Sequence, residues 1–170
     1  MDTVTTNGTM RRTISVMVEN KFGVLARIST LFAARGFNID SLAVGETEDP
    51  SVSRMTIVAS GNENVLEQVE KQLNKLIDVI KVISFITEDH IERDLALIKV
   101  KADKASRSEI FQIVDIFRAK IVDVGTDSLI VEVTGDEAKI TALEQLLKPF
   151  GIKEMVRTGI IAMGRGSQKK

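Results

Sequence analysis

The sequence predicts an α+β protein built from two ferredoxin-like βαββαβ domains in tandem. Apolar residues alternate where strands are expected and recur at helical spacing where helices are expected, in the order β-α-β-β-α-β. The same order returns in the second half of the chain, although the two halves share little residue identity. Between them, six of the seven residues from Thr87 to Arg93 are polar or charged, which indicates a linker.

The first repeat starts with an alternating strand in which Ile14, Val16 and Val18 share one face. The helix that follows ends at Arg35-Gly36, because glycine favours the helix C-cap. Asn62 is a typical N-cap for the second helix, and a run of β-branched residues closes the repeat. We therefore expect strands at 13–19, 38–47, 54–60 and 79–86, and helices over 24–35 and 62–73.

The second repeat contains a hairpin around Gly125-Thr126-Asp127-Ser128, and Pro149 stops its last helix. Its helices show one apolar face each, with Ile110 and Ile140 among the inward residues. The last strand ends at Thr158 or continues to Ala162. We expect strands at 94–102, 120–124, 129–134 and 153–158, and helices over 106–117 and 136–147.

These elements set the expected domain limits. The start of the chain is polar and has neither the basic n-region nor the apolar h-region of a signal peptide. The end of the chain is polar and basic, which is typical of a mobile terminus. We expect a disordered leader at 1–9, a first domain at 10–87, a linker at 88–93, a second domain at 94–163 and a mobile tail at 164–170.

The composition argues against several functions. Lys and Arg number 23 against 24 Asp and Glu, and this balance is unlike the basic surplus that phosphate binding requires. The chain has no cysteine and one histidine, so thiol catalysis and thiolate metal sites are excluded and the catalytic inventory is small. No apolar run approaches the about 20 residues that span a bilayer. We expect a cytoplasmic, non-catalytic protein that binds neither nucleic acid nor membrane.

The single histidine is a weak metal candidate. His90 stands among Glu88, Asp89 and Glu92, but these residues fall in the expected linker, where polar side chains are normal. One histidine with flexible carboxylates gives poor ligand geometry. We therefore expect no metal site.

A ferredoxin-like sheet carries both helices on one face and leaves the other uncovered. Met17, Val44 and Val58 fall near that uncovered face. Small sheets commonly bury such a face, or an edge strand, against a partner. The first domain is therefore expected to form a homodimer.

One loop has the features of an anion site. Asn20 and Gly23 precede a helix whose first amides lack intrahelical partners and carry the positive end of the dipole. Because Gly23 has no side chain, a carboxylate could approach the amides of Val24 and Leu25. The alternative is that Asn20 and Gly23 only shape a turn and cap a helix, and that Asn38 only follows the helix exit.

Taken together, the motifs of both halves resemble one family, the regulatory small subunit of acetolactate synthase (acetohydroxyacid synthase), whose first half is an ACT domain. The resemblance spans roughly residues 10–166. It rests on Glu19-Asn20, Gly23-Val24-Leu25, Arg27, Leu31-Phe32, Arg35-Gly36, Asn38-Ile39, Ser41-Leu42, Thr47-Glu48-Asp49-Pro50, Ser53-Arg54-Met55-Thr56, Glu92 to Leu97, Phe117 to Val124 and Arg157-Thr158-Gly159.

The resemblance implies a subunit without catalytic residues that activates the catalytic (large) subunit and confers feedback inhibition by valine, or by leucine or isoleucine. It implies thiamine diphosphate, magnesium and FAD on that catalytic partner and no cofactor on this chain. It also implies ACT domains that pair side by side, with the effector between two chains. The implied effector-binding residues are Asn20, Gly23, Val24, Leu25, Asn38 and Ile39, with an indirect role for Gln68.

Other functions remain open at this point. An ACT-domain sensor could serve a different biosynthetic enzyme and bind another amino acid. A ferredoxin-like sheet could bind RNA, but the seven phenylalanines are scattered in helices and loops and form no stacking platform. A small acyl-phosphate hydrolase would need a phosphate loop, which is absent from the sequence. The second domain has 101–107 in place of the Asn/Gly loop, so it is expected to be a poor amino-acid site.

Overall fold

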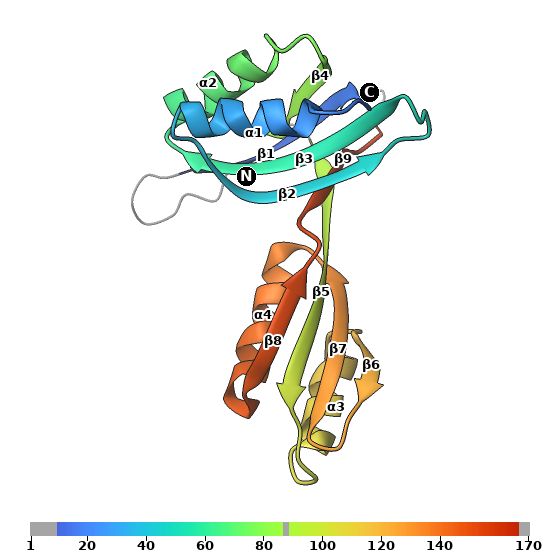
Figure 1. Cartoon of the computed structure of the whole chain (residues 1–170). Coiled ribbons are helices and arrows are strands. Elements are labelled where there is room, and N and C mark those ends of the chain that lie inside the picture. The colour runs from blue at the N-terminus through green and yellow to red at the C-terminus, as the bar shows by residue number, and fades with distance from the viewer. Residues whose placement is uncertain (1–9, 87–88, 167–170) are drawn as a thin grey trace. The chain divides into compact units, whose positions relative to one another are not determined.

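The structure is a computed structural model that describes residues 10–86 and 89–166. Its contacts divide the chain into two compact units. The second unit is Glu92–Gly159, and the first comprises the described residues before and after that segment. Each unit repeats the βαββαβ order, with its two helices on one face of an antiparallel sheet (Figure 1). The predicted fold class, α+β with two ferredoxin-like domains, is confirmed.

The first unit has the sheet order β2-β3-β1-β4, so that β2 and β4 are the edge strands. Two of the predicted caps are formed: Asn62 Oδ1 accepts a hydrogen bond from the Val65 N–H at 3.0 Å, and Gly36 adopts a left-handed φ of 66°. The elements are β1 (Met10–Glu19), α1 (Val24–Ala34), β2 (Asn38–Glu46), β3 (Val52–Gly61), α2 (Glu63–Leu73) and β4 (Val79–Ser84).

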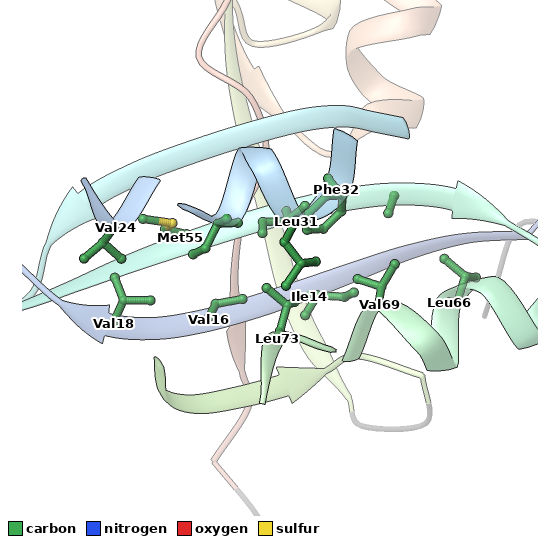
Figure 2. Close-up of a cluster of buried hydrophobic side chains, with 13 residues drawn as sticks. Ile14, Val16, Val18, Val24, Leu31, Phe32, Met55, Leu66, Val69 and Leu73 are labelled. Carbon is green, nitrogen blue, oxygen red and sulfur yellow. The ribbon is translucent and has the colours of Figure 1, made fainter. Parts of the chain in front are cut away.

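The core of the first unit lies between the sheet and its two helices. Ile14, Val16 and Val18 of β1 point toward the side chains of both helices (Figure 2). Phe32 of α1 is 1% exposed, and burying a side chain of this size contributes about 1.5–3 kcal/mol. The alternating pattern read from the sequence therefore identifies the face of β1 that packs under the helices.

The second unit has the sheet order β6-β7-β5-β8. Pro149 lies in a short 3-10 turn, Lys148–Phe150, directly after the last helix, as its stop signal predicts. Ile98, Ile110 and Ile140 are fully buried in a separate core cluster. The elements are β5 (His90–Lys101), α3 (Arg107–Ile116), β6 (Lys120–Val124), β7 (Ser128–Gly135), α4 (Glu137–Leu147) and β8 (Ile152–Arg157).

The last strand differs from the sequence-based expectation. β8 ends at Arg157, and Gly159 then turns the chain with a left-handed φ of 87°. A separate strand, β9 (Ile161–Gly164), follows, and the contacts group residues 160–166 with the first unit. The expected second domain, 94–163, therefore extends four residues too far, because a glycine in that conformation interrupts a run that reads as one strand.

This returning segment covers part of the first sheet. Ile160 and Ala162 are 3% and 5% exposed, and the Ile160 N–H donates to Ser41 Oγ at 3.1 Å. Ser41 is the register partner of Val58, which is fully buried although it points away from the helix-side core. The chain itself thus covers the part of this sheet face around Val58, which was expected to need a partner. Val44, which was placed near the same face, is 48% exposed. Homodimer formation stays a prediction that no longer rests on Val58.

The expected leader, 1–9, lies outside the described residues, as do 167–170 of the expected tail. Within the described part of that tail, Arg165 Nε lies 3.1 Å from Asp89 Oδ1 and the Arg165 N–H donates to Asp89 O at 2.9 Å. Mobility of the tail stays a prediction.

Candidate functional site

The N-terminus of α1 is open. Gly23 is its N-cap residue, with φ 81° and ψ -5°, and no side chain caps the helix. The Val24 N–H has only a long contact, 3.5 Å, with Lys21 O, and the Leu25 N–H has no acceptor among the residues described. Because these amides lie at the positive end of the helix dipole, they can bind an anion. A Cβ at Gly23 would meet no atom closer than 3.8 Å, so glycine is needed for its φ rather than for space.

Asn20 ties this loop to the turn between β2 and β3. Its Nδ2 donates to Glu46 Oε1 at 3.1 Å and to Pro50 O at 2.9 Å, and its N–H donates to Ser51 O at 2.7 Å. The donor half of the amide is therefore used within the chain. The Oδ1 acceptor remains to bind a positively charged group.

The other side of the loop is fixed by Asp78, which follows α2. The Asp78 carbonyl accepts from the Glu19 N–H at 2.9 Å, and its carboxylate pairs with Arg27 Nη1 at 2.8 Å. Asp78 is 7% exposed, so this pair is shielded from solvent on the carboxylate side. The beginning of α1 is thus held by its own Arg27 and by the turn before β4.

A solvent-facing cavity of about 550 Å³ adjoins this loop and is lined by Asn20, Lys21 and Phe22. The Phe22 side chain is fully exposed. Lys21 Nζ lies 2.6 Å from Glu19 Oε2, and this hydrogen bond and the charge of Glu19 raise the pKa of Lys21. The cavity therefore has a lysine paired with Glu19, an exposed phenyl ring and an amide acceptor at its edge.

The remaining predicted site residues occupy different positions. Val24 is 3% exposed as a whole residue, whereas Leu25 is 43% exposed. Asn38 is exposed at the start of β2, where its Nδ2 donates to Asp40 Oδ1 at 2.5 Å. Ile39 is half-buried and packs against the core of its own unit. Gln68 is exposed on α2 and is not one of the residues that line this cavity.

The equivalent helix of the second unit has a different start. Asp103 Oδ1 accepts from the N–H groups of Ala105 and Ser106 at 3.0 and 2.8 Å, and from Ser106 Oγ at 2.9 Å. The backbone and side-chain hydrogen bonds from Ser106 lower the pKa of Asp103. A carboxylate of the chain itself therefore binds the amides of the turn just before α3, whose N-cap residue, Ser106, makes no side-chain cap hydrogen bond.

Two other expectations concern metals and membranes. No group of three His, Cys, Asp or Glu in the described part of the chain could hold a metal ion. His90 stacks on Phe85, with ring centroids 4.5 Å apart. In residues 10–86 and 89–166, none of the helices has the length and apolar character that crossing a membrane requires.

The comparisons with known proteins place the βαββαβ unit of the first half in the ACT class of domain. Residues 14–81 match the AHAS small subunit-like ACT domain. Residues 93–166 match the C-terminal model described as the small subunit of acetolactate synthase. The chain belongs to the family of acetolactate synthase small subunits.

Individual relatives support this assignment over nearly the whole chain. The chain is 58% identical to a probable acetolactate synthase small subunit of Archaeoglobus fulgidus, over 94% of this chain and 100% of that one. It is 53% identical to the acetolactate synthase small subunit of Mycolicibacterium smegmatis, over 94% of both chains. The crystal structure of the Thermotoga maritima small subunit superposes with a TM-score of 0.84 at 45% identity, covering 92% of this chain and 98% of that one.

These matches confirm the family that the motifs resembled, its place in branched-chain amino-acid biosynthesis, and the class of regulatory small subunit rather than enzyme. The positions that bind an effector stay a prediction. Sequence reasoning missed Glu46 and Asp78, which fix the loop, because their contacts join segments far apart in the chain. It also missed Asp103, although the spacing of Asp103 and Ser106 before a helix is a capping signal.

Proposed function

We propose that this chain binds the catalytic subunit of acetolactate synthase, raises its activity and makes it sensitive to inhibition by valine. The observation that supports this most directly is the start of α1, where Gly23 is the N-cap residue and no side chain caps the helix. The identity of the enzyme is inferred from membership of the small-subunit family. The class of effector is inferred from the chemistry of the loop. Binding of valine in preference to leucine or isoleucine is part of the proposal.

The effector would lie with its carboxylate at the amides of Val24 and Leu25. Each charge-assisted hydrogen bond of this kind contributes about 1.5–3 kcal/mol. The ammonium group would be accepted by Asn20 Oδ1, whose amide nitrogen is already held by Glu46 and Pro50. A valine side chain has two more carbons than alanine, at about 0.8 kcal/mol each, which gives roughly a fifteenfold preference.

We propose further that two copies complete the site. The loop from Asn20 to Leu25 of one copy would face Asn38 and Ile39 of another across a side-by-side dimer of ACT domains. In one chain Ile39 packs against its own core, so only its remaining exposed part would touch the effector. An effector bound by two chains favours one dimer arrangement over others, and that difference is what can be transmitted to an enzyme. Gln68 would act indirectly.

The catalytic partner would carry the reaction chemistry. Thiamine diphosphate, magnesium and FAD are expected there, and no cofactor is expected on this chain. A coupling free energy of about 1–3 kcal/mol between effector binding and the enzyme would suffice for feedback inhibition. The cytoplasm is the proposed location, because a chain without cysteine fits a reducing compartment.

The test is reconstitution. The purified chain is titrated into the catalytic subunit of acetolactate synthase, and product formation is measured with and without valine. We expect stimulation by the chain alone and its reversal by valine. Absence of stimulation would contradict the assignment of the partner.

Calorimetry separates the effector from the partner. Valine, leucine, isoleucine, serine and phenylalanine are each titrated into the chain in the absence of the enzyme. We expect heat of binding with valine in preference to the others. Binding of serine or phenylalanine instead would favour an ACT-domain sensor for a different biosynthetic enzyme.

A further inference from the structure

The helix layer of the first unit contains a groove that the proposed effector site does not use. It lies between α1 and α2 and has a volume of about 450 Å³. Its floor includes Leu31 and Leu76, and its walls include the basic residues Arg27, Arg35 and Lys75. Along α1 the lining runs from Ala26 to Arg35, which corresponds to about 13 Å of helix.

The groove is locally cationic in a chain whose net charge is -1. None of the residues that line it is acidic. Arg27 is paired with Asp78, but Arg35 Nη2 donates to the neutral side chain of Gln72 at 2.9 Å, and Lys75 has no acidic partner among the residues described. Two positive charges therefore remain without a counter-charge above an apolar floor, an arrangement that favours an anionic occupant.

An exposed apolar side chain continues the groove at the Leu76 end. Ile77 follows Leu76 directly and is 91% exposed, although the neighbouring Asp78 is nearly buried. The Glu19–Asp78 backbone hydrogen bond brings this turn beside the loop that carries the fully exposed Phe22. Large apolar side chains of this kind, next to basic ones, are typical anchors of protein interfaces.

We propose that the α1–α2 groove, with Ile77 at its end, is the surface that binds an acidic segment of the catalytic subunit. This inference rests on the proposed function. The segment carries carboxylates that pair with Arg35 and Lys75, and an apolar side chain that packs on Ile77. An inorganic anion would fill only a part of a groove of this length and would leave its apolar floor uncovered. A second copy in a symmetric contact would place the same positive charges against each other.

The position also connects docking with sensing. Arg27 belongs both to the wall of the groove and to the pair with Asp78 that fixes the start of α1. A segment bound in the groove therefore contacts the helix whose first turn would hold the effector. Differential binding to one arrangement of that helix is sufficient for coupling between the two surfaces.

The experiment compares charge reversals on and off the groove. The variants are Arg35→Glu with Lys75→Glu, Ile77→Asp, and the control Lys71→Glu, which lies on α2 outside the groove, is 61% exposed and pairs with Glu67 at 3.1 Å. Each is titrated into the catalytic subunit, and the half-saturating concentration is read from stimulation and from direct binding. We expect it to rise about tenfold or more for the double variant and for Ile77→Asp, and to stay within about twofold for Lys71→Glu.

Salt dependence gives a second readout. The half-saturating concentration of the wild type should rise with ionic strength, and that of the double variant should rise much less, because screening acts on the removed charges. Thermal unfolding and valine calorimetry without the enzyme establish that each variant is folded and retains its effector site.

Several outcomes would overturn the inference. If the wild type binds and stimulates the catalytic subunit while the groove variants do so equally well, the docking surface lies elsewhere and the proposed function stands. If the wild type itself fails to bind the catalytic subunit, both the groove proposal and the proposed function are contradicted. If the double variant, measured without the catalytic subunit, has a different sedimentation coefficient from the wild type, the groove is a contact between copies of this chain. Displacement of the enzyme by phosphate, but not by chloride of equal ionic strength, would assign the groove to a small anion.

Discussion

The two units of the chain differ in the loop that leads into their first helix. In the first unit, the N-cap is Gly23, no side chain caps the helix, and the Leu25 N–H has no acceptor among the described residues. In the second unit, the N-cap residue Ser106 also makes no side-chain cap hydrogen bond, but Asp103, three residues earlier, accepts from the amides of Ala105 and Ser106 in the turn that leads into α3. The same fold thus presents one helix entrance without an internal carboxylate and one where a carboxylate of the chain binds the amides just before the helix.

The difference separates a structural role from a candidate binding role on the same scaffold. Arg107 strengthens the closure of the second loop, because its guanidinium donates to the carbonyls of Gly125 and Thr126. In the first unit the loop is instead fixed from outside, by Asn20 and by the Arg27–Asp78 pair. Fixing a loop without filling its amides is what a preorganised anion site requires.

The largest effect is expected from giving the first unit the internal carboxylate of the second. In Gly23→Asp, the new N-cap carboxylate would accept from the amide of Leu25 and repel the effector's carboxylate from the helix start. Loss of two charge-assisted bonds of about 1.5–3 kcal/mol each weakens valine binding about a hundredfold or more. Calorimetry measures the affinity, and the enzyme assay should show stimulation without inhibition.

The matched control is Gly23→Ala, which adds backbone strain without a carboxylate. Any side chain at φ 81° is disfavoured, by about 1–2 kcal/mol, while the space around a Cβ is open. We expect Gly23→Ala to lower stability and to keep measurable valine binding. Equal valine affinity in Gly23→Asp and in the wild type would remove the effector from this loop.

A second substitution tests whether β2 completes the site. Asn38→Lys places a cation where the proposed effector carries its ammonium group, and it breaks the contact with Asp40. We expect the inhibition constant for valine to rise at least about tenfold through like-charge repulsion, with stimulation of the enzyme largely retained. If both Asn38→Lys and Gly23→Asp stay fully sensitive to valine, the site lies elsewhere.

The strand and helix patterns predicted most of the fold because each depends on neighbours along the chain. Ile14, Val16 and Val18 alternate, and they form one face of the core strand. The error at 160–163 has a different origin. Residues after Gly159 keep a strand-like pattern, and their assignment to the first unit depends on a contact with Ser41 that no local pattern encodes.

The candidate site was predictable to the same extent. The glycine before α1 is a local signal, and the structure has it in the left-handed conformation that opens the helix start. The loop is held by hydrogen bonds from Asn20 to Glu46 and Pro50 and by the ion pair of Arg27 with Asp78. These contacts join residues 26 to 51 positions apart, so no local sequence pattern predicts them. Sequence reasoning therefore predicted the loop before α1 as a site and missed the contacts that hold this loop in place.

A smaller effect is expected when the second helix start is opened. Asp103→Ala removes the acceptor of two amides and of the Ser106 hydroxyl. Loss of such a cap lowers the unfolding midpoint by about 2–5 °C. Differential scanning calorimetry measures the shift, with Asp103→Asn as the variant that keeps an acceptor. Valine affinity should be unchanged, because the exposed amides of Ala105 and Ser106 still lack the Asn and Gly loop; a gain of valine binding would contradict the comparison.

The smallest effect is the pH dependence of that same cap. Hydrogen bonds from Ser106 lower the pKa of Asp103 in the folded chain, so the unfolded chain binds its proton at higher pH. The contribution of the carboxylate to stability is therefore fully present above the unfolded pKa of about 4 and is lost as pH falls through the lower folded pKa. The stability difference between the wild type and Asp103→Asn should be constant from pH 7 to about pH 5 and shrink at lower pH. Denaturant unfolding at a series of pH values measures it, and a difference that grows on acidification would mean that Asp103 does not cap the helix as an anion.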